Sequence, residues 1–366
     1  MTDEPVLQAM RRHWPKLRPL LLLAATATAE QPGISAAGAT PQSRRFTAAA
    51  DAELLLLGPA ARRPHALPPL PAGVSPALIT HVGLRDLGLI PRVRVVDLGC
   101  PVAPAVPHLR LPLVETAGPA ACVSSGEAMK PQRVNALLER GRRWGEGWPP
   151  QEPLLLGECV PGGTTTALAV MQGLGLAADG LVSGSLREPA HGLKARLVRQ
   201  GLAAANLPRT ADPLAVLAAV GDPMQVLAVG LLQALAQRRV PVLLAGGSQM
   251  AAVLAAALAL TAPPRRPALA ACCAVATTAW VAEEAGSDLA RLMQLIGERW
   301  EVETLLQVAS LHFHGCSSQA LYDYECGYVK EGVGAGGVAV LWELAGRAPA
   351  ELAQACDQAC VQLLDA

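Results

Sequence analysis

The chain of 366 residues is long enough to bury a large hydrophobic core. Hydrophobic residues make up 51% of it, charged residues 16% and aromatic residues only 3%, so the apolar content is mainly alanine, leucine and valine. Thirty basic and thirty acidic residues cancel, which argues against the basic surface of a nucleic-acid-binding protein and favours a small-molecule substrate.

The first apolar segment, residues 17–29, follows Arg11, Arg12 and Lys16 and has two interpretations. A short apolar core behind basic residues is typical of a secretory signal, but this core is only about seven residues long, which is short for a signal. A buried strand that runs into a turn explains the segment as well. We therefore expect a helix before Pro19 and then a strand.

Proline and glycine divide the next part of the chain. Residues 62–76 and 101–107 are rich in proline and are predicted as loops. Between them, residues 93–98 form a nearly continuous apolar run that predicts a buried strand. Residues 144–153 are the best candidate for a boundary between two parts of the chain.

Beyond that point one pattern recurs: a short apolar run, a glycine-rich turn and a helical stretch. The apolar runs are residues 154–156, 240–245 and 328–329, and one of the helices is expected to begin at about Gln249. Uninterrupted runs are typical of strands covered on both faces, and alternation with helices indicates parallel strands. The sequence therefore predicts an α/β protein with a mostly parallel, doubly wound, Rossmann-like sheet, whose ligands bind beyond the carboxyl ends of the strands.

Residues 240–264 carry no charge and are long enough to span a bilayer. Pro241 and the break Gly246-Gly247-Ser248 instead predict a strand, a loop and a helix, so we expect no membrane association. The nine cysteines are odd in number and lack Cys-x-x-Cys spacing, which predicts buried free thiols rather than disulfides or a zinc site. Free thiols favour a cytoplasmic protein.

The strongest chemical signal lies at residues 157–166, where a turn leads into a helix. Gly162 and Gly163 allow the backbone to approach a ligand, and Thr164 and Thr165 add hydroxyls beside the first free N–H groups of the helix. Such a helix N-terminus is a natural phosphate site. An ordinary turn capped by threonine explains the same residues, and the missing lysine excludes a P-loop.

Other candidate residues also allow two interpretations. Glu158 and Glu331 each lie near a glycine-rich turn, where a shielded glutamate can accept a proton, but Glu331 can equally form a solvated pair with the preceding lysine. Lys194 is by itself typical of a helix surface. His312 and His314 are suited to a metal pair, but the sequence offers no third ligand, so we expect core or surface histidines and no metal.

Taken in order, these segments resemble the nicotinate-nucleotide:dimethylbenzimidazole phosphoribosyltransferase family of cobalamin lower-ligand synthesis, especially its uncharacterised archaeal and cyanobacterial branch. Residues 157–165 (GECVPGGTT) are similar to the family's phosphate turn Gly-Glu-Met-x-x-Gly-Asn-Thr-Thr. Residues 330–335 (KEGVGA) are similar to its catalytic Gly-Glu-Gly-Thr-Gly-Ala, and residues 238–244 (RRVPVLL) to its strand Ala-Arg-Arg-Ile-Pro-Val-Val-Leu. Residues 32–40 (PGISAAGAT) are a hallmark of the uncharacterised branch.

Further similarities are Met129, the helical residues 136–141, and the turn at residues 183–185 followed by Lys194, so the resemblance spans roughly residues 32–344. The chain also departs from the family pattern. The family's Asp-Gly-Phe after the central strand is replaced by residues 245–248 (AGGS), its Phe-Glu by Pro223-Met224, and its phosphate-turn asparagine is absent.

The resemblance implies phosphoribosyl transfer from nicotinate mononucleotide to a nitrogen of an aromatic base, with no cofactor. It implies Glu331 as the catalytic base and, as substrate- or phosphate-binding residues, Glu158, Gly162, Gly163, Thr164, Thr165, Lys194, Gly246, Gly247, Ser248, Gly332 and Gly334. It implies a homodimer whose subunit is one unit over residues 1–366. In that unit, residues 19–345 form the α/β core and residues 1–18 and 346–366 a small, mainly helical lobe. The alternative is a non-catalytic nucleotide- or phosphate-binding protein that retains the fold.

Overall fold

The computed structural model describes residues 4–112, 117–208 and 210–365. Its centre is a seven-stranded sheet in the order β3-β2-β1-β4-β5-β6-β7, in which all neighbouring strands are parallel. The strands are β1 (Arg18–Leu23), β2 (Arg94–Asp97), β3 (Leu109–Arg110), β4 (Leu154–Cys159), β5 (Val242–Ala245), β6 (Cys273–Thr277) and β7 (Leu306–Val308). The predicted Rossmann-like sheet is confirmed, and its strand order reverses between β1 and β4.

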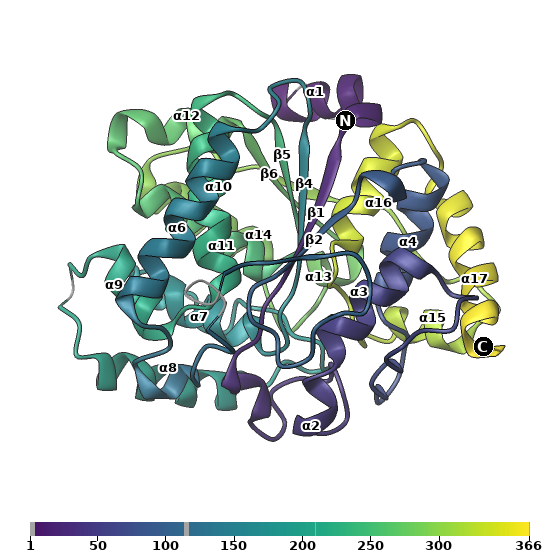
Figure 1. Ribbon diagram of the computed structural model, residues 1–366, viewed down its shortest axis with the longest axis horizontal. Coiled ribbons are helices and arrows are strands. Elements are labelled where there is room, and N and C mark those ends of the chain that lie inside the picture. Colours follow the sequence, from purple (N-terminus) through teal and green to yellow (C-terminus); the bar gives the residue numbers. More distant parts are fainter. Residues whose placement is uncertain (1–3, 113–116, 209, 366) are drawn as a thin grey trace.

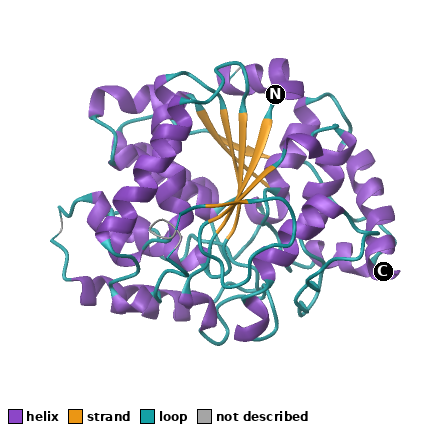
Figure 2. Cartoon of the chain, viewed as in Figure 1, coloured by secondary structure: helices purple, strands orange, loops and turns teal. Residues whose placement is uncertain are grey.

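Helices cover both faces of the sheet (Figures 1 and 2). One face packs against α6 (Pro131–Glu146), α7 (Gly163–Gly173), α8 (His191–Ala205), α9 (Pro213–Val220), α10 (Pro223–Gln237), α11 (Ser248–Ala259), α12 (Arg266–Ala271) and α14 (Leu289–Trp300). The other packs against α1 (Pro5–His13), α3 (Thr47–Leu57), α4 (Ala77–Asp86), α15 (Gln319–Glu325), α16 (Ala335–Leu344) and α17 (Pro349–Asp365). Two short helices, α2 (Pro41–Arg44) and α13 (Ala279–Ala282), complete the set of α-helices among the described residues.

The two covered faces explain why the strands are apolar without alternation. In β1, Leu20 and Leu22 belong to the hydrophobic core on one face, and Leu21 and Leu23 to the core on the other. Each successive side chain of a strand points to the opposite face, so both sets must be apolar when both faces are buried. The first apolar segment is thus a central strand followed by a turn, as expected.

The long uncharged segment also folds as expected, into β5 and α11 with a glycine break between them. Within the described part of the chain, no helix has both the length and the apolar character needed to cross a membrane. All nine cysteines are free, and each is buried or partly buried.

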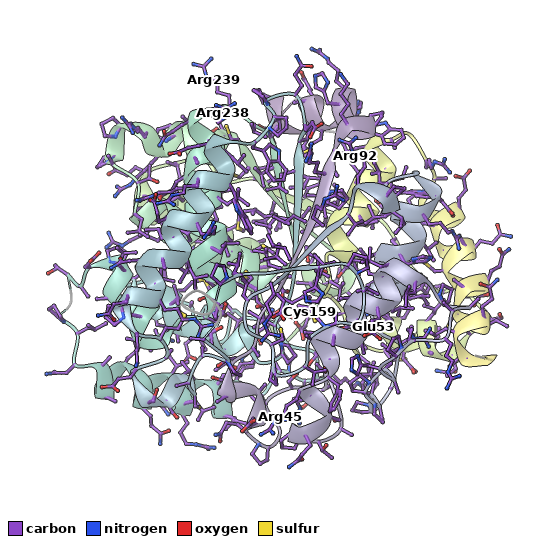
Figure 3. The ribbon with its side chains drawn as sticks, in the orientation of Figure 1. Arg45, Glu53, Arg92, Cys159, Arg238 and Arg239 are labelled. Carbon is purple, nitrogen blue, oxygen red and sulfur yellow. The ribbon has the colours of Figure 1, made fainter. Side chains whose placement is uncertain are left out.

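The pair Arg238-Arg239 lies exposed at the amino end of β5, whereas Cys159 lies at the carboxyl end of β4, near the middle of the molecule (Figure 3).

Two expectations about chain organisation are wrong. Residues 328–329 do not form a strand, because Val329 and Lys330 have left-handed φ angles of 64° and 65°, which no strand adopts. Residues 144–153 do not divide the structure, because they run from the last turn of α6 to β4, and β4 pairs directly with β1. The chain ends contribute α1 and α17, while residues 1–3 and 366 lie outside the described residues; the division into a core and a small lobe stays a prediction.

Candidate active site

A cavity of about 370 Å³ opens beyond the carboxyl ends of the central strands. It is lined by residues 158–164 at and after the end of β4, by residues 247–249 after β5, and by Val329 and residues 331–333 before α16. Residues from the amino-terminal quarter of the chain, including Asp51 of α3, form another wall. Parallel sheets bind ligands at this edge, and the volume falls in the range of small-molecule sites.

The turn between β4 and α7 has two adjacent glycines, and its backbone requires glycine at Gly162. Gly162 has a φ of 80°, and a Cβ atom there would lie 2.9 Å from the backbone nitrogen of Ala29. A Cβ atom on Gly163 would collide with the side chain of Gln249. The two glycines are therefore explained first by backbone conformation and packing. Their effect is to bring the amino end of α7 to the cavity.

The threonines of this turn differ in their surroundings. Thr164 is partly exposed and lines the cavity. Thr165 is fully buried, and its hydroxyl has no partner among the described residues. Thr166 is also buried, with its Oγ1 2.6 Å from Oδ2 of Asp222. The amides of Gly163 and Thr165 donate to carbonyl oxygens within the turn and are therefore not free for a ligand. Thr164 is the threonine of this helix end whose side chain lines the cavity.

Glu158 lies at the end of β4 and is 5% exposed. Its Oε2 accepts a hydrogen bond of 2.9 Å from the amide of Val160. Burial, together with the nearby carboxylates of Asp222 and Glu331, raises the pKa of Glu158 to about 8. In the absence of a ligand, Glu158 is therefore mainly protonated at neutral pH.

The Glu331 carboxylate accepts four hydrogen bonds. Oε1 accepts from the amides of Gly332 and Gly336, both at 3.0 Å. Oε2 accepts from the amide of Thr278 and the hydroxyl of Thr277, both at 3.1 Å. Burial raises the pKa of Glu331, and these four bonds oppose that shift because they stabilise the ionised form. A carboxylate held in this way has one fixed orientation at the cavity wall.

Lys330 forms no solvated pair with Glu331. Its side chain is buried, and Nζ donates to Oε1 of Glu284 at 2.6 Å and to the carbonyl oxygen of Leu186 at 2.6 Å. Lys330 and Val333 both have left-handed φ angles, 65° and 54°, which are unfavourable for side chains with a Cβ. The buried ion pair anchors the strained turn that presents Glu331.

Seven of the eleven predicted binding residues line the cavity together with Glu331: Glu158, Gly162, Gly163, Thr164, Gly247, Ser248 and Gly332. Thr165, Lys194, Gly246 and Gly334 do not line it. Lys194 is buried in α8, where its Nζ donates to the carbonyl oxygen of Ser183 at 2.5 Å and burial lowers its pKa to about 7. Gly334 instead packs against Gly157 at the start of α16. The binding roles given to these residues stay predictions.

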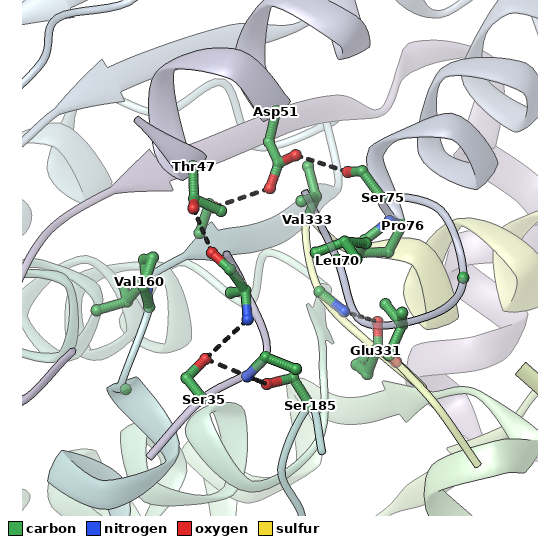
Figure 4. A pocket seen from close by; sticks show the side chains of 18 of the residues that line it. Ser35, Thr47, Asp51, Leu70, Ser75, Pro76, Val160, Ser185, Glu331 and Val333 are labelled. Carbon is green, nitrogen blue, oxygen red and sulfur yellow. Dashed lines mark hydrogen bonds between the residues drawn. The ribbon is translucent and has the colours of Figure 1, made fainter. Parts of the chain in front are cut away.

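Two charged residues of the cavity wall were missed in the sequence. Asp51 accepts a hydrogen bond of 2.6 Å from Ser75 (Figure 4), and burial raises its pKa to about 6. Arg63 is the only cation among the described lining residues, and its Nε is buried without a partner in the described part of the chain. A signal for Asp51 did exist, because it interrupts the apolar run at residues 48–57. Arg63 stands in a proline-rich loop and gives no such signal.

Comparisons with known proteins agree with this architecture. A model of a phosphoribosyltransferase family matches residues 90–280. A UPF0284 protein of Prochlorococcus marinus strain MIT 9313 is 51% identical to the chain, covering 94% of this chain and 86% of the relative.

Two solved structures from Thermus thermophilus share the fold at 20% identity. One is a nicotinate-nucleotide–dimethylbenzimidazole phosphoribosyltransferase, with a TM-score of 0.57 over 98% of this chain and 88% of that chain. The other is CobT, with a TM-score of 0.60 over 96% of this chain and 90% of that chain. The chain belongs to the phosphoribosyltransferase family, in the group whose cyanobacterial members are called UPF0284 proteins.

Proposed function

We propose that this protein transfers the phosphoribosyl group of nicotinate mononucleotide to a nitrogen of an aromatic base. The observation that carries the proposal is that one cavity is lined both by the amino end of α7 and by the fixed carboxylate of Glu331. Family membership and the fold shared with a nicotinate-nucleotide-dependent enzyme support the same reaction. We further propose that it acts in the cytoplasm as a homodimer.

The donor nucleotide would bind through its charged and polar groups. The amino end of α7 with Thr164 offers donors for the 5′-phosphate. Arg63, the only cation among the described lining residues, would pair with the phosphate or with the nicotinate carboxylate. Ser35 and Ser185, whose hydroxyl oxygens lie 3.1 Å apart on the cavity wall (Figure 4), would bind the ribose hydroxyls. Glu158 would then face the positive charge that develops on the ribose.

The acceptor base would lie against the apolar part of the wall. Leu67, Leu70 and Val74 come from the proline-rich loop, and Leu363 comes from α17. Apolar side chains of this kind cover the faces of an aromatic ring, while the ring nitrogen remains free to approach C1′. In this chain the glycine break after β5 replaces the family's Asp-Gly-Phe, and this change alters the cavity wall beside the proposed acceptor position. We therefore propose only the chemical class of the acceptor.

The chemistry needs one base and no general acid. The bond between C1′ and the pyridinium nitrogen breaks, and its electron pair returns to that nitrogen, so nicotinate leaves with a neutral ring. An unprotonated ring nitrogen of the acceptor forms the new bond to C1′ from the opposite side, and the acceptor ring loses its N–H proton to Glu331. Holding both reactants in one cavity lowers the entropic part of the barrier, and the positioned carboxylate removes the proton.

Proton transfer requires a free lone pair on Glu331. A carboxylate offers about four acceptor positions, and all four are used by the surrounding donors. Three of these donors are backbone amides, whereas the fourth is the hydroxyl of Thr277, which can rotate. We therefore expect Thr277 to give up its hydrogen bond when Glu331 accepts the proton.

The test is nicotinate release from nicotinate mononucleotide with dimethylbenzimidazole or adenine as acceptor. Glu331→Gln should lower transfer at least about a hundredfold, while nucleotide binding, measured by calorimetry, is retained. The glutamine amide would face backbone donors, so a loss of about 1–3 kcal/mol in stability is expected and is measured in parallel. Glu343→Gln, which changes a partly buried glutamate of α16 outside the cavity, is the matched control.

Three outcomes are decisive. Full transfer activity in Glu331→Gln would remove this residue from the mechanism. Loss of nucleotide binding together with activity would assign the carboxylate to orientation of the turn instead. Stabilisation by the nucleotide without nicotinate release for any acceptor would identify a non-catalytic nucleotide-binding protein.

A further inference from the structure

A second cluster of ligand-type side chains lies outside the cavity. His312 and His314 follow β7, and Glu325 is the last residue of α15. Nδ1 of His312 and Nε2 of His314 lie 3.2 Å and 3.4 Å from the same carboxylate oxygen, Oε2 of Glu325. One ligand atom from each residue lies within 4.8 Å of the other two. The third ligand that the sequence did not reveal is thus supplied by the fold.

These separations fit a tetrahedral metal ion. Zinc binds histidine nitrogen and carboxylate oxygen at about 2.0–2.2 Å, which places neighbouring tetrahedral ligands about 3.3–3.5 Å apart. The two nitrogen–oxygen separations already have this size. The imidazole rings are stacked nearly parallel, at 8°, with centroids 5.2 Å apart, so at least one ring must rotate before both nitrogens point to one ion.

A neighbouring amide orients one of the ligands. The amide of Phe313 donates to Oε1 of Glu325 at 2.5 Å, which leaves Oε2 for an ion, and the Glu325 side chain is only 7% exposed. Oε1 of Glu283 lies 4.0 Å from Nε2 of His312, the ring nitrogen opposite the one that faces Glu325. This separation is too long for a hydrogen bond, so Glu283 is a nearby acidic group and does not fix the orientation of the ring.

We propose that His312, His314 and Glu325 bind a divalent transition metal, zinc by preference, with the fourth position open to water. Two imidazole nitrogens and one carboxylate oxygen suit zinc better than magnesium or calcium, which prefer oxygen ligands alone. His314 is 69% exposed, so the ion reaches the site from solvent.

The ion would tie the segment after β7 to α15, and α15 in turn holds the wall of the cavity. Asp323 of α15 accepts a hydrogen bond of 2.8 Å from the amide of Gly73, and the hydroxyl of Tyr324 donates to the carbonyl oxygen of Val74 at 2.7 Å. Gly73 and Val74 line the cavity. The proposed site therefore acts on the cavity through α15.

The experiment is a zinc titration of the full-length protein after treatment with a chelator. Calorimetry should show one zinc ion per chain, and bound zinc should raise the melting temperature. His314→Ala and His312→Ala should each weaken binding at least about a hundredfold, since even outer partners change metal affinity 10–100-fold. His108→Ala is the matched control, because this partly buried histidine contacts the carbonyl oxygen of Val106 and lies outside the cluster.

The absorption spectrum of the protein with cobalt in place of zinc distinguishes this site from binding at the nine free thiols. Thiolate ligands of cobalt give intense near-ultraviolet bands, whereas histidine and carboxylate ligands do not. A one-to-one complex without such bands, lost in His314→Ala, supports the proposal. No zinc binding at micromolar concentration, unchanged binding in His314→Ala, or thiolate bands would overturn it. His314 is exposed, so its variant should fold and decides the question even where His312→Ala unfolds.

Discussion

Replacing Glu158 with glutamine tests the electrostatics of the cavity directly. Glutamine keeps the size of the side chain and its ability to accept the hydrogen bond from Val160. The glutamine side chain cannot ionise, however, whereas Glu158 can, and the folded protein disfavours the ionised form of Glu158. Burial, with the nearby carboxylates of Asp222 and Glu331, raises the pKa of Glu158 from 4.5 to about 8.

The expected effect depends on pH in a definite direction. Because the pKa is higher in the folded state, the stability contributed by protonated Glu158 is fully present below about pH 4.5 and is lost as the pH rises to about 8. A difference of about 3.5 pKa units corresponds to an upper limit of about 5 kcal/mol. The Glu158→Gln variant should match the unmodified protein at pH 4.5 and become increasingly more stable relative to it up to pH 9.

The assay is urea unfolding of both proteins at several pH values between 4.5 and 9, with the free energy of unfolding taken from each curve. Glu139→Gln is the control, because Glu139 is an exposed glutamate of α6 that pairs with Arg143 at the surface. That variant should follow the pH profile of the unmodified protein. A stability difference for Glu158→Gln that is the same at pH 4.5 and pH 9 would refute the buried, protonated carboxyl.

Three more predictions follow from the site. Arg63→Met should weaken nicotinate mononucleotide binding about 10–100-fold in calorimetry, whereas exposed Arg62→Met should not. Thr277→Val removes a hydrogen bond to ionised Glu331 and raises the pKa of Glu331, so the acidic limb of the kcat/KM–pH profile should move to higher pH. Thr277→Ser keeps the hydroxyl and is the control. If the acidic limb lies at the same pH in both variants, the Thr277 hydroxyl does not act on Glu331. Lys330→Met leaves a buried carboxylate unpaired and should cost about 3–5 kcal/mol in urea unfolding; a loss below about 1 kcal/mol would mean that this pair does not anchor the turn.

The sheet was predictable where the strands were long and apolar on both faces. β1, β4 and β5 each gave an uninterrupted run, and such a run has few other folded environments. The run at residues 328–329 misled because its backbone is fixed by distant contacts. Those contacts are the ion pair of Lys330 with Glu284 and a hydrogen bond of 2.7 Å from Thr278 to the Lys330 carbonyl oxygen.

The candidate site was predictable only in part, for a related reason. Local motifs revealed the turn after β4 and the turn that carries Glu331, since glycines mark both. The residues contributed by side chains alone, such as Asp51, Arg63 and Gln249, come from separate parts of the chain and have no shared local pattern. The sequence motif suggested that the glycines serve ligand binding, whereas the structure explains Gly162 first by its left-handed φ and its close approach to the backbone of Ala29.

The position of β1 in the sheet has a consequence for synthesis of the protein. β1 lies between β2 and β4, and its residue Arg18 pairs with Leu154, so the middle of the sheet forms only after almost half of the chain has been made. Pairings between such distant segments slow folding. Until β4 emerges from the ribosome, the leucines of β1 have an open edge beside them, and newly made chains should depend on chaperones during that interval.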